Sequence, residues 1–385
     1  MRVKLKDIFD LQMGKTPSRS NLEYWNTTDY KWISIADLTK TSKYIFETKE
    51  YLSKSAIKDS GIKVIPANTV VMSFKLSIGK TAITKEDMYS NEAIMAFKDK
   101  HVINIIPEYI FYLFKYKNWE ECSNKAVMGK TLNKATLSEI EVEICSIEKQ
   151  RQIVNILDKI MSAVDGRKQE LQLLDELIKA QFVEMFGDPV KNPKGWEVVT
   201  IGDIVTEVRY GTSKPAVEGG KYPYLRMNNL TADGHLDLND LKYIDIPDDE
   251  IEKCVVRKGD VLFNRTNSIE LVGKTVVFDL QEDMIIAGYI IRVRLNKRLL
   301  PEILSQYMNL EALKDILRSM AKGAVNQANI NAQELQSIKV YIPDMELQKQ
   351  FIEMKNQVDK SKVAVQKALD ETQILFDSLM QKYFG

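Results

Sequence analysis

The sequence contains an internal repeat, and this repeat constrains the fold of the chain more than any other feature. Residues 148–154 (Glu-Lys-Gln-Arg-Gln-Ile-Val) recur at 346–352 as Glu-Leu-Gln-Lys-Gln-Phe-Ile, an offset of 198 residues. The same offset relates Phe186-Gly187 to Phe384-Gly385. Shorter matches keep the same order upstream at slightly smaller offsets: 3–8 with 199–204, 14–16 with 211–213, 79–81 with 273–275, and 107–108 with 301–302. Such a repeat predicts that one structural unit occurs twice.

Each copy has a mixed first part. Runs of β-branched and aromatic residues at 31–35 and 69–74, bounded by Gly, Pro, Asn or Asp, predict strands in the first copy. In the second copy, 255–256 and 260–263 flank a Lys258-Gly259 turn. Pro at the first turn predicts helices over 107–119 and 301–317, the latter with a break near Leu310.

Each copy ends in a long helix. Apolar residues recur with a 3.5-residue period from Ile153 to Met185 and, more weakly, from Phe351 to Tyr383. Since such a seam buries only one face, each helix needs a partner, and we expect the two to pair with one another. The alternative, an amphipathic helix packed on its own domain, explains a run of about 40 residues poorly.

The expected fold class is α+β, with a pseudo-two-fold internal repeat. Two similar mixed α/β domains are joined by two long helices that pair as an antiparallel coiled coil. Gly187 followed by Pro189 and Pro193 marks a helix stop and a linker. The expected parts are a domain at 1–145, a helix at 146–187, a linker and domain at 188–343, and a helix at 344–385.

Charge and cysteine content limit the possible environments. The 54 basic and 54 acidic residues balance, which excludes a polybasic arm or acidic tail but not a local basic surface. Three scattered cysteines do not make a disulfide framework. The charged start lacks the apolar core of a secretory signal, and the apolar run 284–291 is too short to span a bilayer. We expect a soluble, cytoplasmic protein.

The catalytic and cofactor-binding motifs that the sequence partly matches are all incomplete. Gly-Lys-Thr occurs at 79–81, 129–131 and 273–275, but the Gly that a phosphate loop needs five residues earlier is replaced by Phe74, Asn124 and Ser268, so we expect exposed turns. Residues 343–344 and 353–355 match the residue types of a metal-dependent nuclease motif, but the second part of the motif, 353–355, falls inside the predicted long helix. His101 and His235 lack neighbours at metal-ligand spacing. We therefore expect a binding protein with no catalytic, cofactor-binding or metal-binding residues.

The layout suits the reading of two separated DNA segments. A helix of about 40 residues is about 60 Å long at 1.5 Å per residue. DNA turns once in about 34–36 Å. Domains at opposite ends of an antiparallel helix pair could each contact the duplex and leave its middle unread.

These residues resemble a known family. A strand that ends in Ile-Pro, followed by Glu-x-Gln-x-x-Ile at the start of a long helix, is similar to the specificity subunits of type I restriction-modification enzymes. The residues are Ile342-Pro343, Glu346, Gln348 and Phe351 in one copy, and Ile144, Glu148, Gln150, Gln152 and Ile153 in the other. The linker 186–197 and the segment 256–263 are similar too. Copy one departs from the pattern because no Pro follows Ile144, and copy two has Phe351 where Ile is usual.

The resemblance implies two target-recognition domains, each reading one half of an interrupted DNA sequence. It also implies that the helices act as a spacer and dock two methyltransferase subunits, with motor-nuclease subunits added for cleavage. S-adenosylmethionine, ATP and Mg²⁺ would then bind to those partners and not to this chain.

Loops at matching places in the two copies are the best candidates for DNA contact, because base edges and phosphates are read by Lys, Arg, Asn, Gln, Ser, Thr and Tyr in loops and at helix ends. Three pairs stand out: 14–19 with 210–214, 73–77 with 264–268, and 128–131 with 322–327. The candidate residues, with the lysines of the Gly-Lys-Thr turns, are Lys15, Thr16, Arg19, Lys75, Lys80, Lys130, Tyr210, Thr212, Lys214, Arg265, Asn267, Lys274, Lys322, Asn326 and Gln327.

Three other functions stay open at this point. The chain could be a two-lobed coiled-coil scaffold that binds proteins rather than DNA. It could be a methyltransferase or nuclease in its own right, although the expected motifs are missing. It could also serve as the recognition subunit of a combined modification-nuclease polypeptide.

Overall fold

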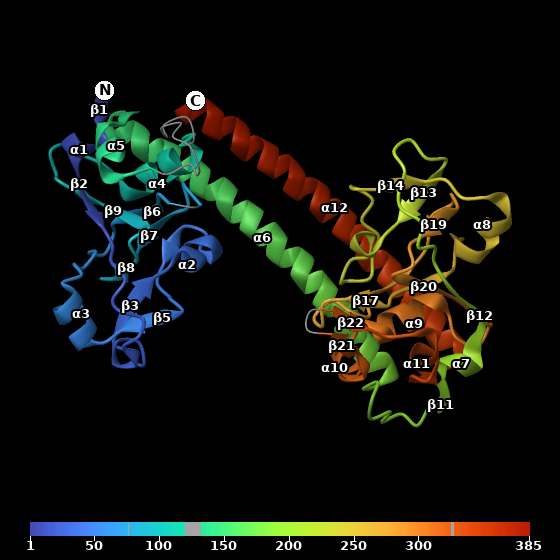
Figure 1. The fold of residues 1–385 in the computed structure, drawn as a ribbon. Coiled ribbons are helices and arrows are strands. Elements are labelled where there is room, and N and C mark those ends of the chain that lie inside the picture. The colour runs from blue at the N-terminus through green and yellow to red at the C-terminus, as the bar shows by residue number, and fades with distance from the viewer. Residues whose placement is uncertain (76, 120–131, 325–326) are drawn as a thin grey trace. The chain divides into compact units, whose positions relative to one another are not determined.

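The chain folds into two compact units, shown with their helices and strands in Figure 1. The computed structural model describes residues 1–75, 77–119, 132–324 and 327–385. Unit 1 comprises Met1–Gly166 and Ala368–Gly385, and unit 2 comprises Arg167–Lys367. Each unit therefore holds one lobe together with part of each long helix.

Unit 1 is built on a five-stranded sheet. Its spatial order is β2 (Phe9–Met13), β9 (Ile94–Asp99), β6 (Val70–Ser73), β7 (Thr81–Thr84) and β4 (Tyr44–Ile45). Neighbours are antiparallel except β7 and β4, which are parallel. A three-stranded sheet has the order β5 (Glu50–Leu52), β3 (Tyr30–Ile33), β8 (Tyr89–Ser90). A two-stranded sheet pairs β1 (Arg2–Lys4) with β10 (Glu141–Glu143). The helices are α1 (Leu5–Ile8), η1 (Leu22–Tyr24), α2 (Ile35–Lys40), α3 (Lys54–Ser60), α4 (Pro107–Tyr116) and α5 (Lys134–Glu139).

Unit 2 repeats this topology. The order β12 (Val205–Tyr210), β20 (Ile290–Leu295), β16 (Val261–Asn264), β18 (Thr275–Val277) matches β2, β9, β6, β7. The order β14 (Lys242–Ile244), β13 (Tyr222–Leu225), β19 (Met284–Ile286) matches β5, β3, β8. In unit 2 this sheet has a fourth strand, β15 (Val255–Val256), next to β19. The pair β11 (Glu197–Thr200), β23 (Lys339–Ile342) matches β1 and β10. The remaining sheet is β17 (Thr266–Asn267), β22 (Gln327–Asn329), β21 (Lys322–Ala324). The helices are α7 (Ile201–Ile204), η2 (Met227–Asn229), α8 (Asp248–Cys254), α9 (Pro301–Met308), α10 (Glu311–Met320) and α11 (Ala332–Gln336). The predicted repeat is confirmed.

The two long helices are α6 (Ile147–Phe186) and α12 (Met345–Phe384). In unit 1, Ile153 and Leu157 of α6 share a core with Phe376 and Met380 of α12. The beginning of α6 thus packs against the end of α12.

In unit 2 the order of the helix segments is reversed. Phe182 and Phe186, near the end of α6, pack on Phe351 near the start of α12, with ring centroids 5.2 and 5.6 Å apart. The helices therefore pair antiparallel. The buried Phe186 lies one residue after Met185, the last residue of the predicted seam, because a 3.6-residue helix drifts against a 3.5-residue repeat.

One local prediction was wrong. Ser34-Ile35 was expected to continue a strand, but Ser34 caps α2. Its hydroxyl accepts from the Asp37 N–H at 3.3 Å, while the Asp37 carboxylate accepts from the Ser34 N–H at 2.8 Å. The segments 255–256 and 261–264 are strands on either side of the expected turn, and they belong to different sheets, since β15 pairs with β19 and β16 pairs with β18 and β20.

Candidate nucleic-acid interface

The loop that follows the edge strand of each main sheet has the same backbone path in both units. Gly14, after β2, donates its N–H to the Ile94 carbonyl at 3.1 Å, and Gly211, after β12, donates to Ile290 at 3.2 Å. The next residues agree as well. Lys15 N–H donates to a carbonyl at 2.8 Å, and Thr212 N–H does so at 2.9 Å. The predicted correspondence of 14–19 with 210–214 is thus present in three dimensions.

Both glycines are required by a close approach of the backbone. A Cβ on Gly14 would lie 2.1 Å from the Asn91 carbonyl oxygen, and one on Gly211 would lie 2.2 Å from that of Ile286. Only glycine fits so close to another strand. The glycine fixes the direction in which the following side chains leave the sheet.

In unit 1 this loop presents a stacked arginine. The Arg19 guanidinium lies 3.8 Å from the Trp25 ring centroid and donates from Nη2 to Glu50 at 3.1 Å. Half of the Arg19 side chain stays exposed. The Thr16 hydroxyl donates to Glu92, and this bond lowers the pKa of that carboxyl group. Lys15 donates its ammonium to the Ser60 carbonyl. The loop side chains are therefore held in place before any ligand arrives.

In unit 2 the loop brings two distant candidates together. The guanidinium of Arg265 lies 5.0 Å from the ring centroid of Tyr210, and its Nη1 donates to the Gly288 carbonyl at 3.4 Å. The Tyr210 ring is 44% exposed, and its hydroxyl accepts from the Ala332 N–H at 2.8 Å. The nearby Lys214 ammonium lies 2.8 Å from Glu250. The Thr212 hydroxyl accepts from the Lys214 N–H at 3.2 Å. Tyr210 and Arg265 form one aromatic and cationic surface.

In the second pair of candidate segments, 73–77 and 264–268, the first residue of each lies at the end of a strand and not in an exposed loop as expected. Ser73 ends β6 and Asn264 ends β16, both fully buried, and Thr266–Asn267 form β17. Ser73 and Asn264 each accept from the glycine of the following Gly-Lys-Thr at 2.9 Å. The sequences 79–81 and 273–275 are therefore closures of tight turns that lead into β7 and β18.

The lysines of these turns are bound to the protein. The Lys80 ammonium donates to the Thr39 hydroxyl at 2.5 Å, and the Lys274 ammonium donates to the Met227 carbonyl at 2.8 Å. Lys274 is only 8% exposed, and burial lowers its pKa. These contacts tie each turn to the helix after β3 or β13, so they indicate a structural role. Among the other candidates, Lys75 lies 5.3 Å from the Phe74 ring and Asn267 donates to the Asn264 side chain at 2.9 Å.

The third pair is only partly described. Lys130 and Asn326 lie outside the described residues. Lys322 and Gln327 lie in β21 and β22, but their side chains are outside the description. Strand β22 pairs with both β17 and β21, so these three strands form one small sheet. No pattern in the sequence indicates this pairing.

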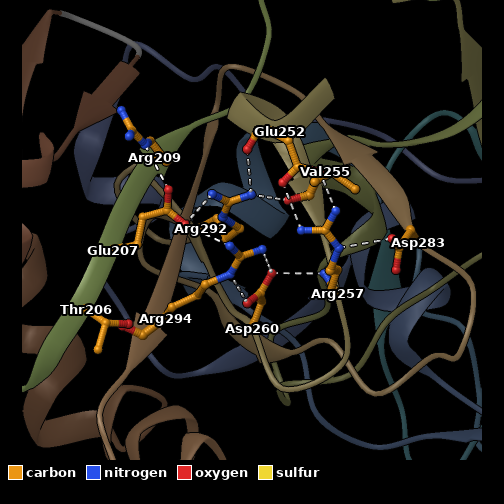
Figure 2. Close-up of polar contacts among 10 residues, drawn as sticks. All are labelled: Thr206, Glu207, Arg209, Glu252, Val255, Arg257, Asp260, Asp283, Arg292 and Arg294. Atoms are coloured by element: carbon orange, nitrogen blue, oxygen red, sulfur yellow. Dashed lines mark hydrogen bonds and ion pairs between the residues drawn. The ribbon is translucent and has the colours of Figure 1, made fainter. Parts of the chain in front are cut away.

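A buried network of charges, which sequence reasoning missed, supports the loop of unit 2 (Figure 2). The fully buried Arg292 of β20 and the half-buried Arg294 both donate to Glu207 of β12 at 2.8 Å. Arg294 also donates to Asp260 at 2.8 Å. Burial acts against ionisation of Glu207, but the hydrogen bond from Arg209 and the charges of both arginines together lower its pKa. The network fixes β12, whose last residue is Tyr210.

Unit 1 has an open groove at the corresponding edge. In the matching register, Asp10 faces Lys98 where Glu207 faces Arg294, and Gln12 faces Ala96 where Arg209 faces Arg292. The buried arginine is therefore absent, and a cavity of about 570 Å³ opens beside β2. Its lining includes four lysines: Lys15, Lys63, Lys98 and Lys134. Such a surface favours an anionic ligand.

Two kinds of feature are absent from the described residues. No helix there is long and apolar enough to cross a membrane. Those residues also hold no group of three or more His, Cys, Asp or Glu side chains that could bind a metal ion.

Comparison with known proteins gives the family. The family model described as type I restriction modification DNA specificity domain matches residues 1–176 and 193–372. A relative from Methanocaldococcus jannaschii, the type I restriction enzyme MjaIX specificity subunit, is 30% identical over 250 residues, which cover 59% of this chain and 57% of that protein. The chain thus spans somewhat more than half the length of this relative.

Solved structures share the fold. A chain from a structure of complex assembly in the type I R-M system aligns over 100% of this chain and 97% of its own length, with a TM-score of 0.61 and 19% identity. The type I restriction-modification S subunit of M. genitalium aligns over 100% and 96%, with a TM-score of 0.53 and 13% identity. The chain belongs to the family of type I restriction modification DNA specificity domains, and it carries this domain twice.

Proposed function

We propose that this chain is the specificity subunit of a type I restriction-modification complex, in which each lobe reads one half of an interrupted duplex target. The observation that carries the proposal is the duplicated loop after β2 and β12. Two glycines with the same close approach direct Lys15, Thr16 and Arg19 in one unit, and Thr212 and Lys214 in the other. An interrupted target has two half-sites, so it requires a DNA-reading loop in each lobe.

The side chains near these loops have the chemistry of DNA recognition. In unit 1, the lysines of the groove beside β2 would hold phosphates, and Arg19 would contact a base edge or phosphate. In unit 2, the Tyr210–Arg265 surface combines a stacking face with a guanidinium that can donate two hydrogen bonds to guanine. Direct base readout and phosphate contact would thus come from different residues of each lobe.

The helices would dock partners. Outward-facing apolar side chains occur along them within each unit: Leu173, Leu177 and Val363 in unit 2, and Ile374 and Leu375 in unit 1. Val363 and Ile374 are 71% and 69% exposed. Large apolar side chains exposed at this level on a helix favour contact with another protein. We assign these faces to two methyltransferase subunits, with motor-nuclease subunits joining for cleavage.

The proposal leaves catalysis to the partners. S-adenosylmethionine, ATP and Mg²⁺ would bind to the methyltransferase and motor-nuclease subunits, and this chain would be non-catalytic. Purified chain incubated with S-adenosylmethionine and random-sequence duplex should transfer no methyl groups. Robust transfer without a partner would contradict this assignment.

A domain exchange tests the recognition role. Residues 1–145 are replaced by the corresponding domain of another family member, and the chimera is expressed with the methyltransferase partner. Methylome sequencing should show one half of the methylated motif changed and the half read by residues 197–343 retained. A simultaneous change of both halves would show that the lobes are not independent readers. Methylation that does not depend on this chain would favour a protein-binding scaffold instead.

A further inference from the structure

In unit 2, the segment between η2 and β14 contacts α12 through a histidine. His235 Nδ1 lies 3.1 Å from an oxygen of Asp233 in the same segment, and His235 Nε2 lies 3.7 Å from Asp359 Oδ1 of α12. Thr231 shapes this segment, since its hydroxyl accepts from the His235 N–H at 2.9 Å and donates to the His235 carbonyl at 2.8 Å. The imidazole thus sits between two carboxylates, one from the lobe and one from the helix.

Further charges surround this contact. Lys355 lies 2.6 Å from Asp359, and Lys362 lies 2.5 Å from Asp175 of α6 and 4.0 Å from Asp233. The side chains of Lys362 and Asp359 are only 15% and 27% exposed. Among the described residues, Asp359 Oδ1 is buried and has no hydrogen-bond partner, and the His235 ring faces it at 3.7 Å. Asp233 from its own segment and Asp359 of α12 face His235 directly. Lys355 and Lys362 of α12 lie against these two carboxylates, and Asp175 of α6 pairs with Lys362.

Unit 1 has a matching contact with a different cation. Lys43 lies in the equivalent segment, between β3 and β5, and its ammonium is 2.5 Å from Asp158 of α6. The Lys43 side chain is 8% exposed. Asp158 also accepts from the Tyr112 hydroxyl at 2.5 Å. Both lobes therefore place a cation from the same segment on an aspartate of the long helix that follows the lobe in the chain.

We propose that these contacts are latches that fix each lobe on the helix pair, and that the latch of the second lobe opens when His235 loses its proton, whereas the latch of the first lobe is built on a lysine. The inference rests on the proposed function in one respect only. If the lobes read separated half-sites, a loosened second lobe weakens the discrimination between gaps of different length.

The direction of the pH effect follows from the partners of His235. The hydrogen bond with Asp233 and then the nearby carboxylate of Asp359 raise the pKa of His235 to about 9, although burial opposes this. The pKa of a histidine in an unfolded chain is about 6.5. Since the folded pKa is the higher one, the latch contributes its full stability below about pH 6.5 and loses it as the pH rises through about 9.

The protein suits a direct measurement because it contains only two histidines, His101 and His235. The side chain of His101 is 86% exposed, so its ring serves as an internal reference. The imidazole signals of the full chain are followed by NMR over pH 5–10, and His235→Gln assigns them. We expect the His235 midpoint near pH 9, falling toward about 6.5 in Asp359→Asn. A His235 midpoint at or below about 6.5 in the wild type would overturn the proposal.

Hydrogen-deuterium exchange of residues 231–236 compares the wild type with two His235 variants. At each pH, all three proteins are measured under the same conditions. His235→Gln should increase exchange at pH 7. His235→Lys, which installs the cation of unit 1, should restore protection at pH 7 and keep it at pH 9.5, where the wild type loses it. Equal exchange in all three proteins would refute the latch. Lys43→Gln should loosen residues 41–45 at both pH values, and unchanged protection there would refute the first latch.

The link to DNA is measured separately, in the complex reconstituted with its methyltransferase partner. His235→Gln should reduce, by about tenfold, the preference for the native gap over a gap one base pair longer, and His235→Lys should recover it. An unchanged preference in His235→Gln would overturn the role in positioning. If the wild-type complex retains no specific duplex at all, the proposed function fails, and the NMR and exchange results still decide the latch.

Discussion

Gln150 and Gln348 lie 198 residues apart and make the same three hydrogen bonds. The Gln150 amide donates to the carbonyls of Asn104 at 3.1 Å and Cys145 at 2.9 Å, and its oxygen accepts from the Ile106 N–H at 3.0 Å. Through these bonds the first turn of α6 holds the residues just before α4 and the residue just after β10.

Gln348 does the same in unit 2. Its amide donates to Arg298 at 3.1 Å and Pro343 at 2.8 Å, and its oxygen accepts from Leu300 at 2.9 Å. Both glutamines are fully buried. The Glu-x-Gln motif is thus a joint between lobe and helix, which gives a physical reason for its presence in both copies.

Gln348→Ala should destabilise the protein because it leaves buried backbone groups without partners. Each such group costs about 1–3 kcal/mol, so we expect a loss of at least about 2 kcal/mol in the free energy of unfolding. Urea unfolding of full-length variants measures it. Gln152→Ala, at an exposed position two residues after Gln150, is the control and should change stability by less than about 0.5 kcal/mol. Similar small effects for both variants would contradict the joint.

The repeat made much of this fold predictable. Offsets in the sequence identified the two lobes, the long helices and the equivalent loops after β2 and β12. The pairing of the two helices was predicted correctly because a 3.5-residue period over some 40 residues leaves one face to bury. Prediction failed where an element is defined by its partner. Thr266–Asn267 form a strand only because they pair with β22, more than 60 residues later in the chain.

The site was harder to predict than the fold for the same reason. The contact of Tyr210 with Arg265 joins two segments that are distant in the sequence. In the sequence, the only sign of the buried Arg292 is a cation within β20, a strand rich in β-branched residues. Its partners Glu207 and Val255 come from other strands. Lys80 and Lys274 were taken for exposed residues because a sequence cannot show which lysine has a backbone or hydroxyl acceptor nearby.

Gly14→Ala and Gly211→Ala should each destabilise the protein strongly. The added Cβ would lie about 2 Å from a backbone oxygen, so the strand or the loop must shift. We expect losses above about 2 kcal/mol and weaker DNA binding through the lobe concerned. Gly166→Ala is the matched control. In the described residues nothing lies within 4 Å of its added Cβ, so this helical position should gain about 0.5–1 kcal/mol. A stable Gly211→Ala variant would show that the close approach is not required.

Arg292→Met should lower the free energy of unfolding by about 3 kcal/mol, since breaking a buried charge pair costs about 3–5 kcal/mol and Arg294 still partners Glu207. Arg209→Met, at the exposed edge of the same network, should cost less than about 1 kcal/mol. Because the pKa of Glu207 is lowered in the folded protein, the stability it contributes is present above its ordinary pKa of 4.5 and is lost as the pH falls below that value. Thermal melts at pH 7 and pH 4 test both statements. Equal losses for the two arginines would contradict the network.

Arg265→Ala separates a structural role from a DNA contact. From the sequence alone Arg265 was expected to be an exposed loop residue without effect on stability, but it is half-buried against Tyr210. We therefore expect a loss of stability of about 0.5–1 kcal/mol from the missing cation-aromatic contact. Loss of a base contact should cost a further 1–3 kcal/mol or so in DNA binding and relax one position of the target. A clear drop in melting temperature with unaltered DNA affinity would show that Arg265 is structural only.

The length of the helix pair should set the gap between half-sites. One heptad inserted after Leu171 and one after Leu369, at equivalent positions of α6 and α12, keeps the apolar seam in phase. Seven residues add about 10 Å, which corresponds to about three base pairs at 3.4 Å each. Three base pairs also rotate one half-site by roughly 100° around the duplex.

The doubly lengthened variant should therefore bind its target more weakly, and any retained activity should move to the same two half-sites with a longer gap. Lengthening only one helix is the control. It puts the seams of α6 and α12 out of register, so this variant should lose stability rather than change its target. Methylome sequencing of cells that carry the doubly lengthened chain with its partners gives the gap directly. If methylation continues at the original gap, the helices do not measure the distance, and the spacing must be set by the lobes or by the partner subunits.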